Sequence, residues 1–248
     1  MKKPSEDTRD FDQTQLKLNG HGKILHRDYT AHFFRWSFAR RLIPTGAKIL
    51  DIGCGQELPL LAVMTSALGQ YRPEVYVGCD LNTIKNKPTS SNFEIKIYDN
   101  FNFVDQSSEI MRNHKPFTYV TCLEVIEHMT PAHGLRLLRG IYDALENGGY
   151  AFISTPCYDG RRHAKNHIHE YSTTELAEAI TSSGFMIVQR IGTFADIKEI
   201  SKDRLAYDMM NRLGTYYDND AISCMLAPAI DPDKARNNFW VLKKEETF

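Results

Sequence analysis

The length, composition and charge of the chain limit the kinds of protein it can be. The chain has 248 residues, of which 42% are hydrophobic and 25% are charged, and its formal net charge is −1. These values predict a soluble globular protein with one large domain, or one domain and a small cap. No apolar run approaches the roughly 20 residues that a membrane span needs, and the small net charge gives no global reason to expect a nucleic-acid partner.

The N-terminus and the cysteines bear on the cellular compartment. Residues 1–7 lead into polar sequence rather than into an apolar signal segment, so we expect a cytoplasmic protein. The five cysteines are an odd number and contain no Cys-x-x-Cys pair. The sequence therefore indicates neither a disulfide framework nor a cysteine zinc site.

Residues 1–44 are predicted to form an N-terminal arm and a helix. The arm is polar and has little apolar periodicity, whereas apolar side chains recur at helical spacing over residues 28–42. Two interpretations of this helix stay open. Its aromatic side packs against the domain, or the helix is a lid over a ligand cleft that brings three side chains near substrate: Tyr29, His32 and Trp36.

Residues 48–55 have the sequence Lys-Ile-Leu-Asp-Ile-Gly-Cys-Gly, which predicts a short buried strand that ends in a glycine turn. Gly53 and Gly55 permit positive φ angles and let a ligand approach main-chain atoms that a Cβ would shield. Pro59 fits the first position of a following helix. A strand, a glycine turn and a helix in this order are typical of a cofactor-binding edge.

Further strand patterns follow along the chain. The predicted strands are residues 74–80, 93–99, 117–122, 150–154, 185–191 and 238–243. Thr130 before Pro131 and Ser172 before Glu175 mark the starts of two helices. Strands separated by helical segments, five times in succession, predict an α/β protein with a parallel sheet. Residues from about 196 to 233 interrupt this pattern, and we expect them to form a cap-like insertion.

Acidic residues follow three of the predicted strands, namely Asp51, Asp80 and Asp99. The carboxyl ends of neighbouring parallel strands share one edge of a sheet, so these acids predict one ligand site. The Gly-x-Gly-x-x-Gly pattern of a dinucleotide site fails, because Leu58 holds the third glycine position and Glu57 puts a carboxylate where a pyrophosphate would bind. S-adenosylmethionine instead offers a donor to each acid through its ammonium, its ribose diol and its adenine amino group.

Four segments resemble the successive motifs of class I S-adenosylmethionine-dependent methyltransferases. They are residues 49–55, 78–81, 123–128 and 148–156. The resemblance spans roughly residues 45–191 and implies an α/β, Rossmann-like methyltransferase fold. Its sheet would have seven mostly parallel strands with helices on both faces and an antiparallel last strand. The methyltransferase domain would then cover residues 45–248.

The resemblance also implies which residues bind the cofactor. Asp51 and the two glycines would line the methionine moiety, Asp80 would hold the ribose hydroxyls, and Asp99 with its neighbour would flank the adenine. The predicted cofactor-binding residues are Asp51, Gly53, Gly55, Glu57, Asp80, Leu81, Tyr98, Asp99 and Leu123. Glu57 departs from the family pattern, and two roles stay open for it: it binds the amino group of the cofactor, or it belongs to the helix cap.

A second group of candidate site residues follows the fourth predicted strand. Small-RNA terminal 2′-O-methyltransferases and ubiquinone-pathway O-methyltransferases resemble this segment, Glu-x-x-Glu-His. One interpretation is a site for Mg²⁺ or Mn²⁺, completed by His167 or His169 from the loop after the fifth strand. The metal ligands that we predict are Glu124, Glu127, His128 and His169. The other interpretation is the wall of a substrate pocket.

Methyl transfer from a sulfonium is a direct displacement, so a base is needed only where the acceptor must lose a proton. His128 is the favoured base, and Glu124 and His169 are the other catalytic candidates. The loop at residues 161–169 is an exposed connection or a basic mouth for an anionic acceptor. The cap would supply the acceptor pocket, or its aromatic and methionine side chains would be its own core.

Three functions follow, in order of preference. The first is methyl transfer from S-adenosylmethionine to a hydroxyl or amine of a small-molecule or nucleotide-like acceptor. The second is a metal-assisted RNA 2′-O-methyltransferase, which is less favoured because no long Lys/Arg cluster offers a path for RNA. The third is a binding protein that keeps the methyltransferase fold without turnover. The sequence names neither the acceptor nor the oligomeric state.

Overall fold

The structure is a computed structural model that describes residues 27–66, 72–114, 116–160, 164–217 and 219–245. The predicted N-terminal arm lies outside the described residues, as does the side chain of Tyr29. Within the described part of the chain, no helix is long and apolar enough to cross a membrane.

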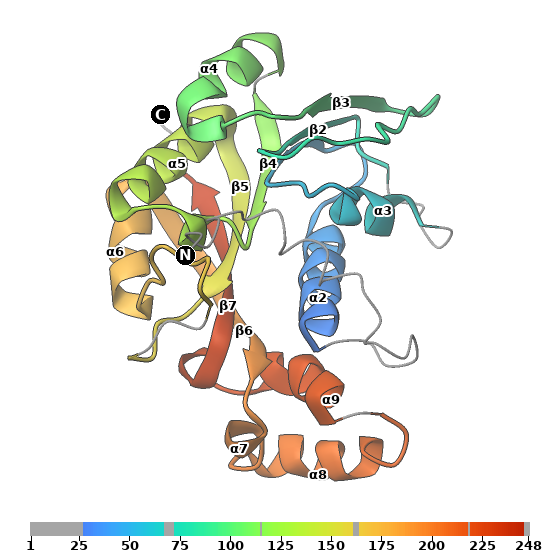
Figure 1. The fold of residues 1–248 in the computed structure, drawn as a ribbon, viewed down its shortest axis with the longest axis vertical. Helices are drawn as coiled ribbons and strands as arrows, with labels where there is room; N and C mark the ends of the chain where they lie inside the picture. The colour runs from blue at the N-terminus through green and yellow to red at the C-terminus, as the bar shows by residue number, and fades with distance from the viewer. Residues whose placement is uncertain (1–26, 67–71, 115, 161–163, 218, 246–248) are drawn as a thin grey trace, which may run out of the picture.

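A seven-stranded sheet forms the centre of the molecule, with the order β3-β2-β1-β4-β5-β7-β6 (Figure 1). The strands are β1 Lys48–Ile52, β2 Val75–Cys79, β3 Glu94–Tyr98, β4 Phe117–Leu123, β5 Leu145–Pro156, β6 Phe185–Ala195 and β7 Ala235–Lys244. β7 lies between β5 and β6 and runs antiparallel to both, whereas the β3-β2-β1-β4-β5 pairs are parallel. The predicted fold, with its antiparallel last strand, is confirmed.

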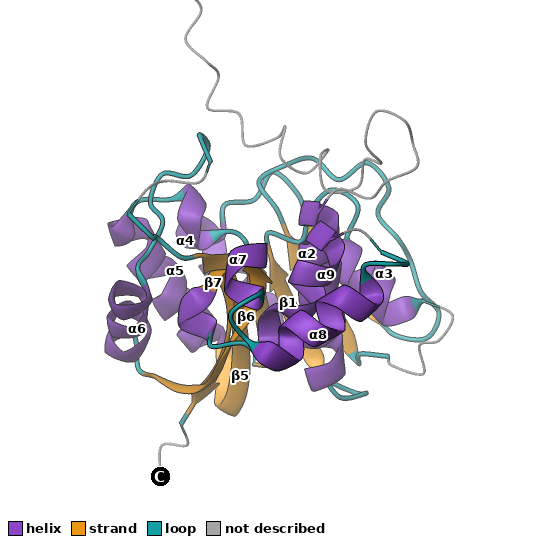
Figure 2. Ribbon diagram, turned by 90° about the horizontal axis from the view of Figure 1, so that it is seen from below, coloured by secondary structure: helices purple, strands orange, loops and turns teal. Residues whose placement is uncertain are grey.

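Helices cover both faces of the sheet, as Figures 1 and 2 show. The helices of the main domain are α2 Arg27–Leu42, α3 Pro59–Thr65, α4 Phe103–His114, α5 Pro131–Ala144 and α6 Thr173–Ser182. α2 and α3 pack on one face, and α4, α5 and α6 pack on the other. The side chains of Thr130 and Ser172 accept hydrogen bonds from the amides of His133 and Glu175, so both predicted helix starts are capped.

Each face of the sheet has its own hydrophobic core. Successive side chains of a strand point to opposite faces, so Leu50 packs against α4, α5 and α6 while Ile49 packs on the α2 side. Trp36, Ala39 and Ile43 of α2 are buried in the second core. At about 1.5–3 kcal/mol for each fully buried large apolar side chain, these contacts tie α2 firmly to the domain.

Two connections differ from the prediction of regularly alternating strands and helices. Residues 80–93, between β2 and β3, contain no helix. Helix α4, which lies between β3 and β4, was not foreseen. Its apolar side chains are two pairs, residues 103–104 and 110–111, with five polar residues between them. The apolar stripe that would indicate a helix is therefore interrupted in its middle.

The segment between β6 and β7 forms the region that we call the cap. It contains the helices α7 Ile197–Ile200, α8 Arg204–Leu213 and α9 Asn219–Leu226, and the short 3-10 helices η3 Ala227–Ala229 and η4 Pro232–Lys234. These helices enclose a small apolar cluster of their own, which includes Ile200, Met210 and Ile222. α9 packs against α2 and β6, so the cap continues the α2 side of the sheet. The boundary at residues 44 and 45 stays a prediction.

Candidate functional site

The glycine turn after β1 needs both of its glycines. Gly53 has φ +69° and Gly55 has φ +72°, a region that side chains other than glycine adopt only with strain. The amides of Gly53 and Cys54 both donate to the carbonyl of Cys79, at 2.8 and 3.1 Å, which ties the turn to the end of β2. A Cβ on Gly53 would lie 2.3 Å from Cγ2 of Val125, so a side chain there would also clash.

Asp80 fastens the same turn from the end of β2. Its Oδ2 accepts a hydrogen bond from the Gly55 amide at 2.9 Å. Its Oδ1 accepts from the backbone amide of Asn82 at 2.7 Å and from the Asn82 side chain at 2.9 Å. The carboxylate is buried, and because it already has three donors its position at the sheet edge is fixed.

Asp51 lies at the end of β1, beneath the turn. Tyr76 donates its hydroxyl to Oδ2 and Thr121 donates its hydroxyl to Oδ1, each at 2.6 Å. Burial raises the pKa of Asp51 to about 6, although the two hydrogen bonds act in the opposite direction, and the nearby charge of Asp80 adds to the rise. A buried carboxyl of this kind favours a cationic partner.

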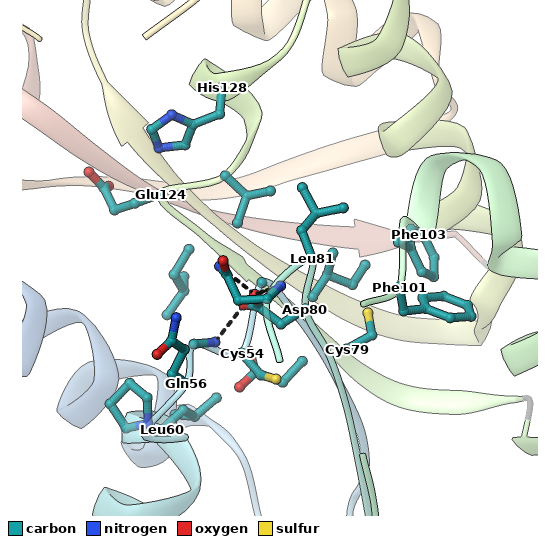
Figure 3. A pocket seen from close by; sticks show the side chains of 18 of the residues that line it. Cys54, Gln56, Leu60, Cys79, Asp80, Leu81, Phe101, Phe103, Glu124 and His128 are labelled. Atoms are coloured by element: carbon teal, nitrogen blue, oxygen red, sulfur yellow. Dashed lines mark hydrogen bonds between the residues drawn. The ribbon is translucent and has the colours of Figure 1, made fainter. Parts of the chain in front are cut away.

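A cavity runs along this edge of the sheet and has two chemically different ends (Figure 3). Phe101 and Phe103, which lie before and at the start of α4, form an aromatic end. Glu124 and His128 form a polar end, and Asp80 lies between the two ends. His32 and Trp36 of α2 also line the cavity, and their stacked rings have centroids 5.6 Å apart. We call the part lined by α2, Glu124 and His128 the acceptor end.

Most of the predicted cofactor-binding residues line this cavity. They are Asp51, Gly53, Gly55, Glu57, Asp80, Leu81 and Leu123. Glu57 is exposed at the rim, and it also lines a second hollow behind α3. The N-cap residue of α3 is Leu58, in the left-handed conformation with φ 49°, and it makes no side-chain hydrogen bond that caps the helix.

Tyr98 and Asp99 do not line this cavity, and their role beside the adenine stays a prediction. The Tyr98 hydroxyl lies 2.8 Å from Nε2 of His114 on α4. Asp99 forms an ion pair with Lys87, and this hydrogen bond lowers the pKa of Asp99.

The cavity instead receives Phe101, Asn102 and Phe103. Sequence reasoning missed these three residues because it stopped at the acid that follows β3. The signal was present, since two aromatic side chains flank an amide directly before a helix.

Glu124 has an unusual backbone and a well-defined carboxylate. Its φ of 58° is left-handed, which is uncommon outside glycine and costs about 1 kcal/mol. Oε1 accepts from the Ser154 hydroxyl and Oε2 accepts from the Asn237 side chain, both at 2.9 Å. Nε of Arg35, on α2, lies 3.6 Å from Oε1. Elements far apart in the chain therefore converge on one carboxylate at the acceptor end.

Behind Glu124, three side chains come within 4.8 Å of one another: Glu127, His128 and His167. Glu127 and His128 belong to the 3-10 helix η2, Ile126–His128. Oε2 of Glu127 accepts from the Thr155 hydroxyl at 3.2 Å, whereas its buried Oε1 has no hydrogen-bond partner among the described residues. Burial, and next the charge of Glu124, raise the pKa of Glu127 well above its usual range. Without a cation nearby, this carboxyl favours its protonated form.

The imidazole of His128 is held by the loop after β5. Its Nδ1 lies 3.1 Å from the backbone carbonyl of Asn166, so Nδ1 carries the proton and the lone pair is on Nε2. Burial lowers the pKa of His128, and this favours the neutral ring at pH 7. The amides of Ile168 and His169 both donate to the carbonyl of Glu127, which fixes the loop against η2.

The structure does not bring His169, which we predicted as a metal ligand, into this group. Nε2 of His169 lies 2.7 Å from a carboxylate oxygen of Glu175 on α6, and its ring packs edge-on against Tyr171. His167, two residues earlier, faces His128 instead and pairs with the buried Glu170. Glu124 also lies outside the group and lines the cavity.

The described part of the loop gives no support to the idea of a basic mouth. Arg161, Arg162 and His163 lie outside the described residues. Lys165 is exposed and is not part of the cavity wall. Among the described residues, no lysine or arginine lines the cavity, and its charged side chains are all acidic apart from its histidines.

A glycine turn fastened by Asp80, with Asp51 beneath it, in a seven-stranded sheet of this order, matches the Rossmann-like methyltransferase fold. The family described as "Methyltransferase domain" matches residues 25–190, which is more than half of the 248-residue chain. The chain therefore belongs to this family and to the class I S-adenosylmethionine-dependent methyltransferase superfamily. No curated protein matches the chain.

Solved structures of similar fold agree with the family. A SAM-dependent methyltransferase from Archaeoglobus fulgidus is 15% identical with a TM-score of 0.55, and the match covers 89% of this chain and 95% of that one. A methyltransferase from Mesorhizobium loti is 16% identical with a TM-score of 0.52 and coverages of 88% and 100%. The Burkholderia thailandensis 1,6-didemethyltoxoflavin-N1-methyltransferase, solved with bound 1,6-didemethyltoxoflavin and S-adenosylhomocysteine, is 14% identical with a TM-score of 0.52 and coverages of 89% and 78%. At these identities the likeness concerns the fold.

Proposed function

We propose that this protein transfers a methyl group from S-adenosylmethionine to a hydroxyl or amine of a small-molecule or nucleotide-like acceptor. The observation that carries the proposal is that the same cavity is lined by the glycine turn with Asp51 and Asp80 and by Glu124 with His128. Membership of the methyltransferase family supports it. The acidic wall favours a neutral or cationic acceptor over one that carries phosphates.

The residues of the turn suit the parts of this cofactor. Asp51, buried and with a pKa raised to about 6, would be stabilised as a carboxylate by the cofactor's ammonium group. Asp80 would accept a hydrogen bond from the ribose diol with the lone pair of Oδ2 that the Gly55 amide leaves. Phe101 and Phe103 would pack beside the adenine, and the amide of Asn102 would meet its polar edge. The cofactor supplies the methyl group as a sulfonium electrophile.

The acceptor end would align the nucleophile and take its proton. His128 presents the lone pair of Nε2 in the tautomer that Asn166 enforces, and its lowered pKa keeps the ring able to accept a proton at pH 7. Trp36 and His32 of α2 would exclude water from this end. Orienting the two reactants can supply about 7–11 kcal/mol of the barrier reduction, so most of the rate would come from position.

The direct test is a binding measurement followed by a screen. Calorimetry with S-adenosylmethionine should show binding, and absence of binding at millimolar ligand would refute the methyltransferase proposal. A radiolabelled methyl-transfer screen over phenols, small amines, nucleotides, sugars and short RNA should then label a neutral or cationic small molecule. Binding without transfer to any of these acceptors would favour the alternative of a binding protein without turnover.

The group of Glu127, His128 and His167 supports a second candidate, a metal-assisted RNA 2′-O-methyltransferase. A carboxylate and two imidazoles are suitable ligands for Mn²⁺, and a bound cation would satisfy the unpartnered Oε1 of Glu127. The cation would supply Lewis-acid activation of a ribose hydroxyl. Activity that is abolished by chelation, restored by Mn²⁺ or Mg²⁺, and specific for RNA 3′ ends would favour this candidate. Activity that survives chelation would exclude it.

A further inference from the structure

Arg35 is a charged side chain that the proposed chemistry does not use, although it lies beside the acceptor end. It belongs to α2 and is only 2% exposed, which makes it one of the largest fully buried side chains of the described structure. Its Nη2 donates to Nδ1 of His32 at 2.7 Å. Its Nε and Nη1 have no hydrogen-bond partner among the described residues.

The nearest opposite charge to this guanidinium is Glu124. Nε of Arg35 lies 3.6 Å from Oε1 of Glu124, too far for a hydrogen bond and close enough for a strong Coulomb attraction in a buried setting. A buried arginine that uses one of its five donors stabilises a fold poorly, because an apolar side chain of the same volume would fill the space without desolvating a charge. The position of Arg35 therefore calls for an explanation other than packing.

Arg35 determines how His32 presents itself. A guanidinium can only donate, so Nδ1 of His32 accepts and the proton of the neutral ring is on Nε2. Burial, and next the charge of Arg35, lower the pKa of His32 well below its usual value, so the ring is neutral. His32 lines the cavity in this single tautomer.

Arg35 also completes the set of groups around Glu124. Ser154 of β5 and Asn237 of β7 each donate to one carboxylate oxygen, and Arg35 adds the only positive charge near that carboxylate among the described residues. These partners come from three elements, and only Arg35 comes from the helix that covers the cavity. Without it, Glu124 and His32 would lose the group that links them.

We propose that Arg35 is a positioning residue of the acceptor end. It fixes the tautomer of His32 and the orientation of Glu124, so helix α2 contributes to the geometry of the acceptor site. The effect on His32 stands without the proposed function, whereas the kinetic consequence rests on it. Arg35 itself does not line the cavity, so it acts through its two neighbours.

The first experiment reads the tautomer of His32 directly. Long-range ¹H–¹⁵N spectra of the ¹⁵N-histidine-labelled protein, assigned with a His32→Gln variant, should show Nδ1 unprotonated and Nε2 protonated. Arg35→Met should abolish this pure signature, Arg35→Lys should keep it because a donor remains, and Arg41→Met, an exposed arginine of the same helix, should leave it unchanged. An Nδ1-protonated His32 in the wild type, or unchanged His32 signals in a folded Arg35→Met variant, would overturn the proposal.

The second experiment measures the kinetic consequence with the acceptor that the wild type methylates in the screen described above. Arg35→Met should lower kcat about ten- to a hundredfold, whereas the Kd for S-adenosylmethionine should stay within about twofold. Arg35→Lys should recover part of kcat. The double variant Arg35→Met/Glu124→Gln should be little worse than the poorer single variant, because the two residues act as a unit.

The outcomes separate this inference from the proposed function. Multiplicative losses in the double variant would overturn the coupling of Arg35 to Glu124. If the wild type binds S-adenosylmethionine but methylates nothing in the screen, the proposed function fails, and the spectra of His32 still decide whether Arg35 fixes its tautomer. If Arg35→Met does not fold, Arg35→Gln, whose side-chain carbonyl can accept a hydrogen bond from Nδ1, takes its place in the same spectra: loss of the pure tautomer supports the proposal, and unchanged His32 signals in this folded variant overturn it.

Discussion

The two ends of the cavity are built in opposite ways. The cofactor side rests on the turn between β1 and α3 and on two acids, Asp51 in β1 and Asp80 directly after β2, and hydrogen bonds to backbone amides set the geometry of the turn. The acceptor end is assembled from α2, the segment after β4, the ends of β5 and β7, and a loop near residue 167. The cofactor side is therefore a local structure. The acceptor end is a network of side chains from distant parts of the chain, and substitutions in it would change the specificity for the acceptor.

The largest expected effect that distinguishes the two ends comes from removing the proposed base at the acceptor end. His128→Ala should lower kcat about 10²- to 10⁴-fold, because general base catalysis contributes about that much, while the Kd for S-adenosylmethionine changes little. Steady-state kinetics and calorimetry measure the two effects. His169→Ala is the matched control, because His169 faces Glu175 instead, and an equal loss in that variant would contradict the assignment of roles.

A change confined to the turn should damage the cofactor side and the fold together. Gly53→Ala combines a strained φ of +69° with a contact of 2.3 Å to Val125, so the free energy of unfolding should fall by about 2–4 kcal/mol. Urea denaturation measures this loss. Gly46→Ala has φ +82° but nothing within 4 Å of the new Cβ, so strain alone should cost about 1 kcal/mol. Equal losses in the two variants would mean that Val125 yields to the new side chain.

Substitutions of two acids, Asp80 after β2 and Asp99 after β3, test which strand ends contribute to cofactor binding. Asp80→Ala should weaken binding of S-adenosylmethionine by about ten- to a hundredfold, because it removes ribose hydrogen bonds and loosens Gly55. Asp99→Ala should change binding by less than about twofold, since that side chain pairs with Lys87 outside the cavity. Calorimetry measures the Kd of both variants. A larger increase in Kd for Asp99→Ala than for Asp80→Ala would contradict this assignment of the binding residues.

The smallest expected effect is a pH dependence that belongs to the cofactor side. In the free protein Asp51 has a pKa of about 6, and binding a cation requires the carboxylate, so a proton must leave when the solution is more acidic than this. The Kd should therefore rise about tenfold between pH 7.5 and pH 5. Asp51→Asn should bind more weakly and without this pH dependence, and a wild-type Kd that is flat over the range would contradict the role of Asp51.

The sign for stability is opposite to the sign for binding. A carboxyl whose pKa is raised by folding opposes the fold when ionised, so the ligand-free protein should gain stability from Asp51 as the pH falls from about 6 towards 4. Thermal unfolding with and without S-adenosylmethionine would separate the two trends.

The same contrast explains what the sequence could reveal. Local signals in the sequence predicted three features. Apolar runs indicated the strands, Gly53 and Gly55 indicated the turn, and the acids at strand ends indicated the roles of Asp51 and Asp80. Helix α4 was not predicted because most of its sequence is polar. The strand end at Tyr98 and Asp99 was predictable in the same way, but the contacts of their side chains with His114 and Lys87 were not.

The acceptor end could be predicted only as a list of candidates. Glu124 and His128 follow from the motif, yet whether His167 or His169 joins them depends on one hydrogen-bonded loop conformation. The role of Arg35 could not be predicted from the helical pattern, because an arginine on a helix is expected to be exposed and only its contacts in the structure show that it is buried. Its contact with Glu124 joins residues 89 positions apart, and nothing local encodes that pairing.

The contact between Gly53 and Val125 has a consequence for how such an enzyme can change over evolution. Val125 lies between Glu124 and the 3-10 helix that carries His128, and both of these side chains line the acceptor end. A bulkier residue at position 125 would press on the glycine turn, so a substitution there that alters the acceptor end would also disturb the turn. Libraries for altered acceptor use should therefore keep Val125 and vary His32, which lines the cavity from α2.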